Sequence, residues 1–274
     1  MIYRVAVMIS GLGKHLDITE ALFSNWNSLY DNIKFDFYLA TWEDKIDYKN
    51  YKWITDYVRI NEEECPYDLK THQEGKHQPH YCYTLKRVNE LRNKSEIKYD
   101  AVFQTRTDVL ILKDVLDSLK EMLVDVPDPY RDFKHNQIIP EFIFSFEGTT
   151  SHRHQMWTPD YFFYGHPKSF DKFACIFEDT YIKKISKEKR MHVLQAEYFF
   201  NVGLYNRGIS NIRPQLLIRE PYRFGPDGSH TNAGWPLKHP SPYQIKNLLK
   251  EKGPIFILTH NRYIEKYFKE TPKQ

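Results

Sequence analysis

The stretch Tyr99–Leu112, YDAVFQTRTDVLIL, predicts two short buried strands separated by a polar break. The break carries Arg106 and Asp108, one residue apart. In a parallel sheet, ligands bind beyond the carboxyl ends of the strands. A fixed cation and a carboxylate at such a point indicate a ligand site, and a surface ion pair at a turn is the alternative.

The segments around this stretch predict strands and helices that alternate along the chain. Residues 3–10 have the alternation of a strand and end in a glycine-bearing turn, and Asp17 followed by Glu20 has the spacing of a capping box. This order predicts βαβ units and a parallel sheet in an α/β fold. Further strands are expected over 35–42, 56–60, 101–104, 137–146, 160–167 and 211–224, helices over 17–31, 81–97, 113–123, 168–185 and 191–208, and a strand or a pair of helices over 255–270.

The composition indicates a globular chain without a strong charge. It has 274 residues, of which 41% are hydrophobic, and a net charge of +3, which is too small to predict nucleic-acid binding. Three distant cysteines without a CxxC exclude a disulfide framework and a zinc knuckle, and they favour a reducing compartment. No apolar run reaches transmembrane length, so we expect a cytoplasmic protein without a membrane span. The aromatic share of 16% leaves peripheral contact with a membrane open.

Five segments in a fixed order resemble a group of GT-A-like glycosyltransferases. This group occurs among lipopolysaccharide, capsule and virus-encoded sugar transferases and includes proteins similar to the WavE family. The match covers most of residues 3–208, and the order of the motifs is more specific than any one of them. The segments are VMISGLGKH (7–15), FDFYLATWED (35–44), YDAVFQTRTDVLIL (99–112), DYFFYGHPKSFDKF (160–173) and QAEYFFNVGLYNRGI (195–209).

The resemblance implies a GT-A-like single domain over 1–274, with an open, mostly parallel central sheet flanked by helices. Residues 1–112 would form the nucleotide-binding half and residues 113–274 the acceptor-binding half. The implied function is transfer of a sugar from a nucleotide-diphosphate-sugar donor to a hydroxyl of a glycan or glycoconjugate, in polysaccharide biosynthesis.

The sequence departs from this family at the expected metal site, where Arg106-Thr107-Asp108 replaces the usual Asp-x-Asp. The resemblance implies that Asp108 holds a donor-coupled Mn²⁺ or Mg²⁺, with His230 as a further ligand and His260 as its rival. Such an ion would neutralise the departing diphosphate. Arg106 can bind the same phosphates through a bidentate contact and carry part of that charge.

The donor side is expected at the ends of the first two strands. The resemblance implies that Ser10 and Gly11 contact the nucleotide, and glycine permits close approach of the backbone. Lys14 stands near the place where the family often has an arginine, and Thr41 ends the second strand. Lys86 is a candidate for the diphosphate. The alternatives are an ordinary turn for Ser10 and Gly11 and a solvated helix face for Lys86.

The acceptor side is expected to use a carboxylate as the general base. Glu197 lies in a mostly apolar helical segment, where a carboxylate must be paired, face a cleft or change its pKa. Asp160 is the second candidate, and its alternative is a turn residue. Tyr164 and Gly165 are candidates for the wall of a sugar pocket.

Two other functions remain open from the sequence. A single carboxylate in place of Asp-x-Asp is compatible with a catalytically silent nucleotide- or glycan-binding domain. The histidine-rich segments at 72–80 and 152–154 are compatible with a metal-dependent phosphoesterase, although their spacing does not match a metal-binding helix.

Overall fold

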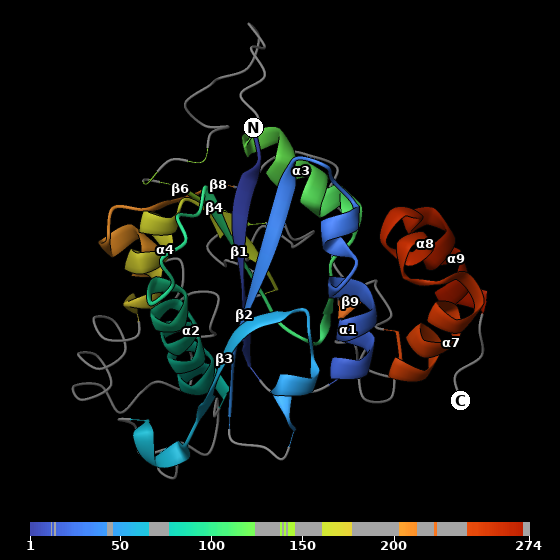
Figure 1. The fold of residues 1–274 in the computed structure, drawn as a ribbon, viewed down its shortest axis with the longest axis horizontal. Helices are drawn as coiled ribbons and strands as arrows, with labels where there is room; N and C mark the ends of the chain where they lie inside the picture. Colours follow the sequence, from blue (N-terminus) through green and yellow to red (C-terminus); the bar gives the residue numbers. More distant parts are fainter. Residues whose placement is uncertain are drawn as a thin grey trace, which may run out of the picture.

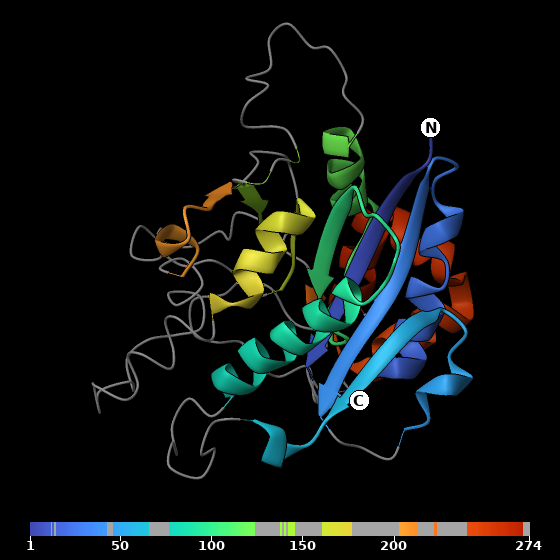
Figure 2. The same cartoon turned by 60° about the vertical axis from the view of Figure 1, so that its left-hand side comes forward.

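The computed structural model shows a large sheet between two layers of helices (Figures 1 and 2). This confirms the predicted α/β class with an open, mostly parallel sheet. None of the described helices is both long enough and apolar enough to cross a lipid bilayer. The structure describes residues 1–11, 13, 15–42, 46–65, 77–123, 138, 140, 142–145, 161–176, 203–212, 222–223 and 240–270.

Four parallel strands make up the first part of the sheet, and they lie in the order β3-β2-β1-β4. β1 and β4 are buried along most of their length, as expected for parallel strands covered by helices on both faces. β3 is an edge strand and is more exposed. The bounds are Tyr3–Gly11 for β1, Ile33–Trp42 for β2, Ile54–Ile60 for β3 and Ala101–Thr105 for β4.

Three short strands continue the sheet beyond β4 in the order β7-β6-β8. β7 (Phe163–Gly165) is antiparallel to β4 and to β6 (Phe142–Phe144), whereas β8 (Ser210–Ile212) is parallel to β6. A separate two-stranded sheet pairs β5 (Val109–Leu110) with β9 (Tyr222–Arg223). The polar break between β4 and β5 therefore separates strands of two different sheets.

The helices cover the two faces of the large sheet in two groups, which lie on opposite sides in Figure 1. One group shares a hydrophobic core with Val5, Val7 and Ile9 of β1, and the other packs against Ala6 and Met8. The first group contains α1 (Leu16–Phe23), α3 (Lys113–Leu123), α7 (Pro242–Lys252), α8 (Pro254–Thr259) and α9 (Asn261–Glu270), and the second contains α2 (His77–Asn93) and α4 (Pro167–Ala174). Short 3₁₀ turns occur at Trp26–Ser28, Tyr48–Asn50 and Glu62–Glu64.

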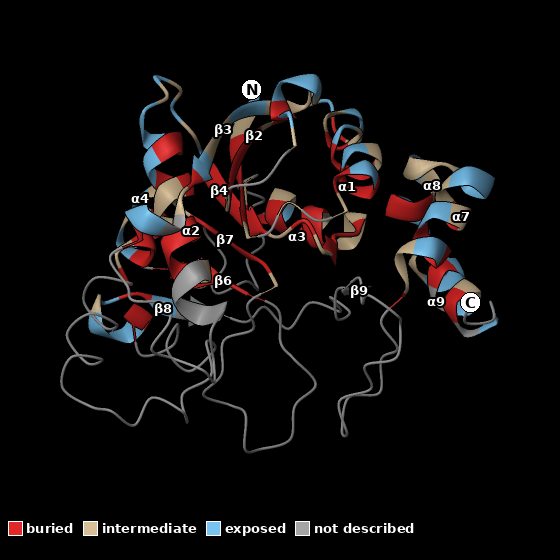
Figure 3. Cartoon of the chain, turned by 90° about the horizontal axis from the view of Figure 1, so that it is seen from below, coloured by how far each residue is buried: buried red, intermediate tan, exposed pale blue. Residues whose placement is uncertain are grey.

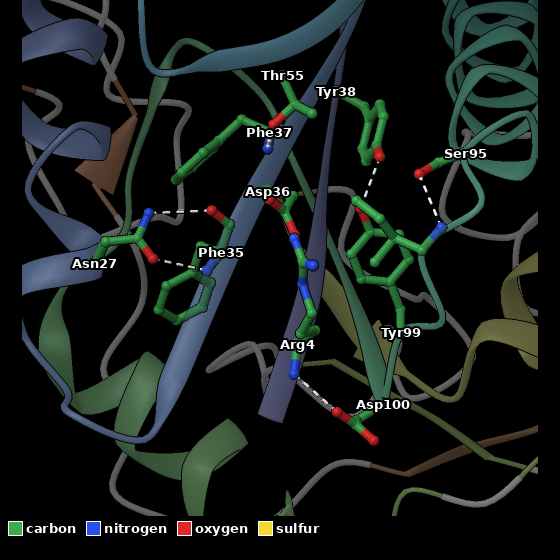
Figure 4. Close-up of polar contacts among 11 residues, drawn as sticks. Arg4, Asn27, Phe35, Asp36, Phe37, Tyr38, Thr55, Ser95, Tyr99 and Asp100 are labelled. Carbon is green, nitrogen blue, oxygen red and sulfur yellow. Dashed lines mark hydrogen bonds and ion pairs between the residues drawn. The ribbon is translucent and has the colours of Figure 1, made fainter. Parts of the chain in front are cut away.

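Polar contacts join the strands near their amino ends, away from the polar break (Figure 4). The Arg4 guanidinium lies 2.6 Å from Asp36 on β2, and the Arg4 amide donates to Asp100 at 2.7 Å. The hydroxyls of Tyr38 and Tyr99 are 2.6 Å apart. Burial, together with this hydrogen bond, raises the pKa of the Tyr99 hydroxyl. These contacts stabilise the end of the sheet opposite to the candidate site.

The predicted capping box at the start of α1 is wrong. The helix begins at Leu16, its N-cap is His15 in the left-handed region (φ 59°), and no side chain caps it. Asp17 lies inside the first turn, and its carboxylate is 2.7 Å from Lys246 of α7. Desolvation raises the pKa of Asp17, but the hydrogen bond and charge of Lys246 outweigh it and leave the pKa lowered. The carboxylate therefore joins two helices instead of capping one.

The capping box of the described chain lies at α7, a helix that our sequence analysis did not predict. The Ser241 hydroxyl accepts from the Gln244 amide at 3.2 Å, and the Gln244 side chain accepts from the Ser241 amide at 2.9 Å. Pro242 occupies the first helical position, where its missing N–H costs nothing. The following segment, 255–270, forms the helix pair α8 and α9, one of the two predicted forms.

We predict that Ser241→Ala lowers the free energy of unfolding by about 1 kcal/mol, because the Gln244 amide loses its acceptor at the start of α7. In a chain of this size, that corresponds to a fall in Tm of roughly 2–4 °C. Differential scanning calorimetry measures it. Ser241→Asp, which keeps an acceptor oxygen, serves as the control, and an equal loss in both variants would contradict the capping role.

Candidate functional site

The candidate site lies where the strand order reverses, at the carboxyl ends of β1 and β4. The chain moves outward from β1 to β2 and β3 and then returns through α2 to β4, on the other side of β1. In the register, Ile9 lies opposite Thr105 and Gly11 opposite Thr41. In open α/β sheets, ligands bind in the crevice at such a switch point. Ser10 and Gly11 therefore lie at the same edge of the sheet as the residues that follow β4.

Gly11 has a backbone conformation that only glycine adopts easily. Its φ is +128°, and a Cβ atom built at this position would meet no atom of the described residues within 4 Å. With respect to the described residues, a side chain would be excluded here by backbone strain instead of by a neighbour. A ligand can approach the main chain closely at this point.

Arg106 and Asp108 form a bidentate ion pair directly after β4. Arg106 Nε donates to Asp108 Oδ1 at 2.8 Å, and a terminal nitrogen donates to Oδ2 at 2.7 Å. The two side chains are 16% and 19% exposed, so this is not a fully solvated surface pair. Thr19 of α1 donates to the Thr107 carbonyl at 3.0 Å and holds the turn against the helix layer. The predicted cation and carboxylate are thus together, and each partly neutralises the other.

Gln104, the residue before the break, is a buried polar side chain that our sequence analysis did not single out. It is 0% exposed, and its Nε2 donates to Ser10 Oγ at 3.1 Å and to the Tyr81 hydroxyl at 2.7 Å. Its Oε1 is buried and has no hydrogen-bond partner among the described residues. The amide therefore joins β1, β4 and the first turns of α2 beneath the crevice. The available signal was a glutamine at the end of an otherwise apolar strand.

Thr41 and Lys86 have different relations to the crevice. Thr41 is fully buried, lies next to Gly11 in the register, and donates to the Trp42 carbonyl at 3.3 Å. Lys86 is on α2, with its ammonium 3.8 Å from Glu90, one turn further along the helix. Glu90 lies toward the end of α2 that is remote from the crevice. In this conformation, Lys86 pairs within α2, which agrees with the alternative of a helix-surface residue.

Four predicted residues of the donor, metal and acceptor sides are not among the described residues. Lys14, Asp160, Glu197 and His230 all lie outside the described residues, so their roles stay predictions.

Tyr164 and Gly165, in contrast, are in the core. The Tyr164 hydroxyl lies 2.7 Å from Ser118, and its ring stacks on Phe103 and Phe144. A Cβ at Gly165 would lie 3.0 Å from the Phe142 carbonyl. These two residues pack β7 against its neighbours and do not form a pocket wall.

The described residues at the crevice fit a divalent cation poorly. Both oxygens of Asp108 accept from Arg106, and a nearby guanidinium opposes a second positive charge. Mg²⁺ and Mn²⁺ favour several oxygen ligands, and no group of three histidine, cysteine or acidic side chains occurs among the described residues. His260, the rival candidate, stacks on Phe256 of α8, with ring centroids 4.0 Å apart.

Comparison with known proteins gives distant likenesses of fold. No protein-family model and no curated protein matches the chain. The apo form of the glycosyltransferase GlyE of Streptococcus pneumoniae TIGR4 is 9% identical with a TM-score of 0.42, over 79% of this chain and 46% of that chain, so this chain spans less than half of GlyE.

Two further structures are similar at the same level. The galactosyltransferase LgtC, in complex with donor and acceptor sugar analogues, is 11% identical with a TM-score of 0.39, over 76% of this chain and 72% of that chain. The apo form of mouse xyloside xylosyltransferase 1 is 7% identical with a TM-score of 0.43, over 78% and 85%. These likenesses concern the fold alone.

We predict that Gln104 couples α2 to the sheet energetically. In a double-mutant cycle of Gln104→Leu with Tyr81→Phe, we expect an interaction free energy of about 1 kcal/mol, because the two side chains share a buried hydrogen bond. Urea unfolding measures each variant. The control cycle pairs Gln104→Leu with Tyr99→Phe, five residues away along the chain, and should be additive within about 0.5 kcal/mol. Additivity in both cycles would contradict the coupling.

Proposed function

We propose that the chain is a glycosyltransferase that moves a sugar from a nucleotide-diphosphate-sugar donor to a hydroxyl of a glycan or glycoconjugate. The observation that carries this proposal is that Gly11 ends β1 and the Arg106–Asp108 pair directly follows the neighbouring strand β4, at the switch point of the sheet. Such crevices bind nucleotides in open α/β sheets. The resemblance of the sequence motifs to sugar transferases supports the reaction class.

The two sides of the crevice suit different parts of a nucleotide diphosphate. At Gly11, a main chain without a side chain suits the ribose and base, which can contact backbone groups directly. After β4, the planar guanidinium of Arg106 suits the diphosphate, because its forked donors match two phosphate oxygens. Ser10 is 1% exposed and serves as support beneath the crevice through its bond from Gln104.

In the proposed reaction, the bond between the sugar anomeric carbon and the diphosphate oxygen breaks, and a bond from that carbon to the acceptor oxygen forms. The electron pair leaves with the nucleoside diphosphate, and the acceptor proton passes to a carboxylate base, for which Glu197 and Asp160 are the candidates. The transition state has oxocarbenium character, so stabilising negative charge on the leaving group lowers the barrier.

Arg106 supplies this stabilisation in our proposal by exchanging one anionic partner for another. In the described conformation two of its donors bond the two oxygens of Asp108. A diphosphate carries more negative charge than one carboxylate and competes with Asp108 for the same donors. Until the diphosphate binds, Asp108 keeps the guanidinium oriented. A donor-coupled Mn²⁺ or Mg²⁺ would need ligands beyond Asp108, and His230 stays a predicted one.

We predict that Arg106→Gln weakens binding of the matching nucleoside diphosphate by about tenfold or more, because charge-assisted hydrogen bonds contribute roughly 1.5–3 kcal/mol. A thermal-shift panel of nucleoside diphosphates, with and without Mn²⁺, measures this, since a ligand at a hundredfold excess over Kd stabilises by about 2.7 kcal/mol. The matched control is Arg4→Gln, which removes another Arg–Asp pair at the opposite end of the sheet.

Asp108→Asn separates the two roles of this carboxylate. If Asp108 orients Arg106, the variant binds the diphosphate at least as well as the wild type without metal, because a competing anion is gone. If Asp108 is a metal ligand, the variant loses a Mn²⁺-dependent gain that the wild type shows. A panel in which no nucleotide stabilises the wild type would overturn the proposal.

We predict that Glu197→Gln or Asp160→Asn lowers turnover by roughly 10²–10⁴-fold, the contribution typical of a general base, while nucleotide affinity stays unchanged. Release of nucleoside diphosphate from the donor, with candidate acceptors and with water, measures turnover. Unchanged turnover in both variants would exclude them as the base. Tight binding without any release in the wild type would indicate the alternative, a catalytically silent nucleotide-binding domain.

A further inference from the structure

The exposed sides of α7, α8 and α9 carry a connected group of aromatic and basic side chains, which we call the basic aromatic face. It consists of Lys252, Phe256, His260, Tyr263 and Lys266. Phe256 stacks on His260 and meets Tyr263 edge-on at 4.9 Å. The Lys252 ammonium lies 5.9 Å and 5.4 Å from the centres of the Phe256 and Tyr263 rings. Lys266 follows Tyr263 on the same side of α9.

The opposite sides of these helices pack into the hydrophobic core. Ile245, Leu248, Ile257 and Ile264 are buried and belong to the hydrophobic cluster shared with α1 and α3. Figure 3 shows the contrast between these buried sides and the exposed outer sides of α7, α8 and α9. The basic aromatic face is therefore not required for packing in the described part of the chain.

The apolar exposure of these helices is unusual for this molecule. Six large hydrophobic side chains are exposed among the described residues, and three of them lie here: Tyr243 (46%), Ile255 (42%) and Tyr263 (36%). Of these three, Tyr263 belongs to the basic aromatic face, and Ile255 directly precedes its member Phe256 in α8.

The net positive charge of the chain also gathers on this segment. Residues 241–270 contain six lysines and arginines and three glutamates. The whole chain has 39 basic and 36 acidic residues, so the remainder is balanced at 33 of each. A surface that combines net positive charge with aromatic rings is complementary to an anionic, partly apolar partner.

We propose that the basic aromatic face docks on an anionic lipid surface. Tyrosine and phenylalanine rings suit the boundary between headgroups and acyl chains, and flanking lysines are attracted by anionic headgroups. Five of the six basic residues in 241–270 are lysines. Lysine is a flexible point charge that suits a diffuse anionic surface, whereas arginine forks suit a defined carboxylate or phosphate partner. The proposal does not depend on the glycosyltransferase activity.

The test is co-sedimentation of the whole chain with vesicles of phosphatidylcholine alone and of phosphatidylcholine mixed with phosphatidylserine, at low and high salt. We expect binding to the mixed vesicles that falls at high salt, because exposed charges are screened. Lys252→Glu/Lys266→Glu should reduce the partition coefficient by at least about tenfold, since each lysine near such a surface contributes roughly fivefold. Tyr263→Ser should reduce it without changing the charge.

The matched control is Lys94→Glu/Lys98→Glu, which makes the same change in net charge at exposed positions after α2, on the other side of the molecule. It should bind within about twofold of the wild type. Equal loss in the control, equal binding to neutral vesicles, or no binding to either would overturn the proposal. Retention on heparin without vesicle binding would also overturn it and would indicate a soluble polyanion. Circular dichroism verifies that each variant is folded.

Discussion

The return of the chain from β3 to β4, across β2 and β1, is the constraint on which the candidate site depends. Parallel neighbours need long crossover connections, and α2 supplies the one that passes back over the sheet. Because α1 and α2 then lie on opposite faces, neither covers the carboxyl ends of β1 and β4. The position of the candidate site is therefore a consequence of topology, and the residues that follow these two strands lie at the switch point whatever their identity.

The identity of those residues determines what the crevice can do. A fully buried amide at Gln104 costs free energy unless its groups are hydrogen-bonded, and its Oε1 has no partner in the described part of the chain. An apolar side chain of similar size would satisfy the core better. The amide nevertheless ties Ser10 and Tyr81 together across three elements. The hydrogen bonds of Gln104 fix the positions of β1, β4 and α2 relative to one another, at the cost of less favourable packing. A preorganised site requires such fixed positions.

Local patterns in the sequence were sufficient for several elements. The helix predicted over 113–123 has these bounds in the structure, and Leu85, Val88 and Leu91 of α2 are buried at their helical spacing. Within the predicted strands at 137–146 and 160–167, the structure describes β6 and β7, whose partners β4 and β8 come from distant segments that the local pattern does not identify.

Other features needed tertiary information or were overlooked. The start of α7 carries a readable capping signal in Ser241, Pro242 and Gln244, although no helix was predicted there. The role of Asp17 could not be predicted, because its partner Lys246 is far away in the sequence. The sequence placed Arg106 and Asp108 at the site, but it left open whether they act as a pair or separately. The hydrogen bonds between them show that the two side chains form a pair.

The pairing of Arg106 with Asp108 changes the electrostatic character of the crevice. A lone guanidinium would attract any anion, whereas a neutralised pair produces little field at a distance. Association of a charged ligand would then gain little from long-range steering, and the affinity would come from exchange of hydrogen bonds at short range. That exchange favours a ligand with two adjacent anionic oxygens, since only such a ligand replaces both bonds that Asp108 provides. In the proposed site, the pair would therefore favour a bidentate anion, at the cost of part of the affinity that the guanidinium alone would give.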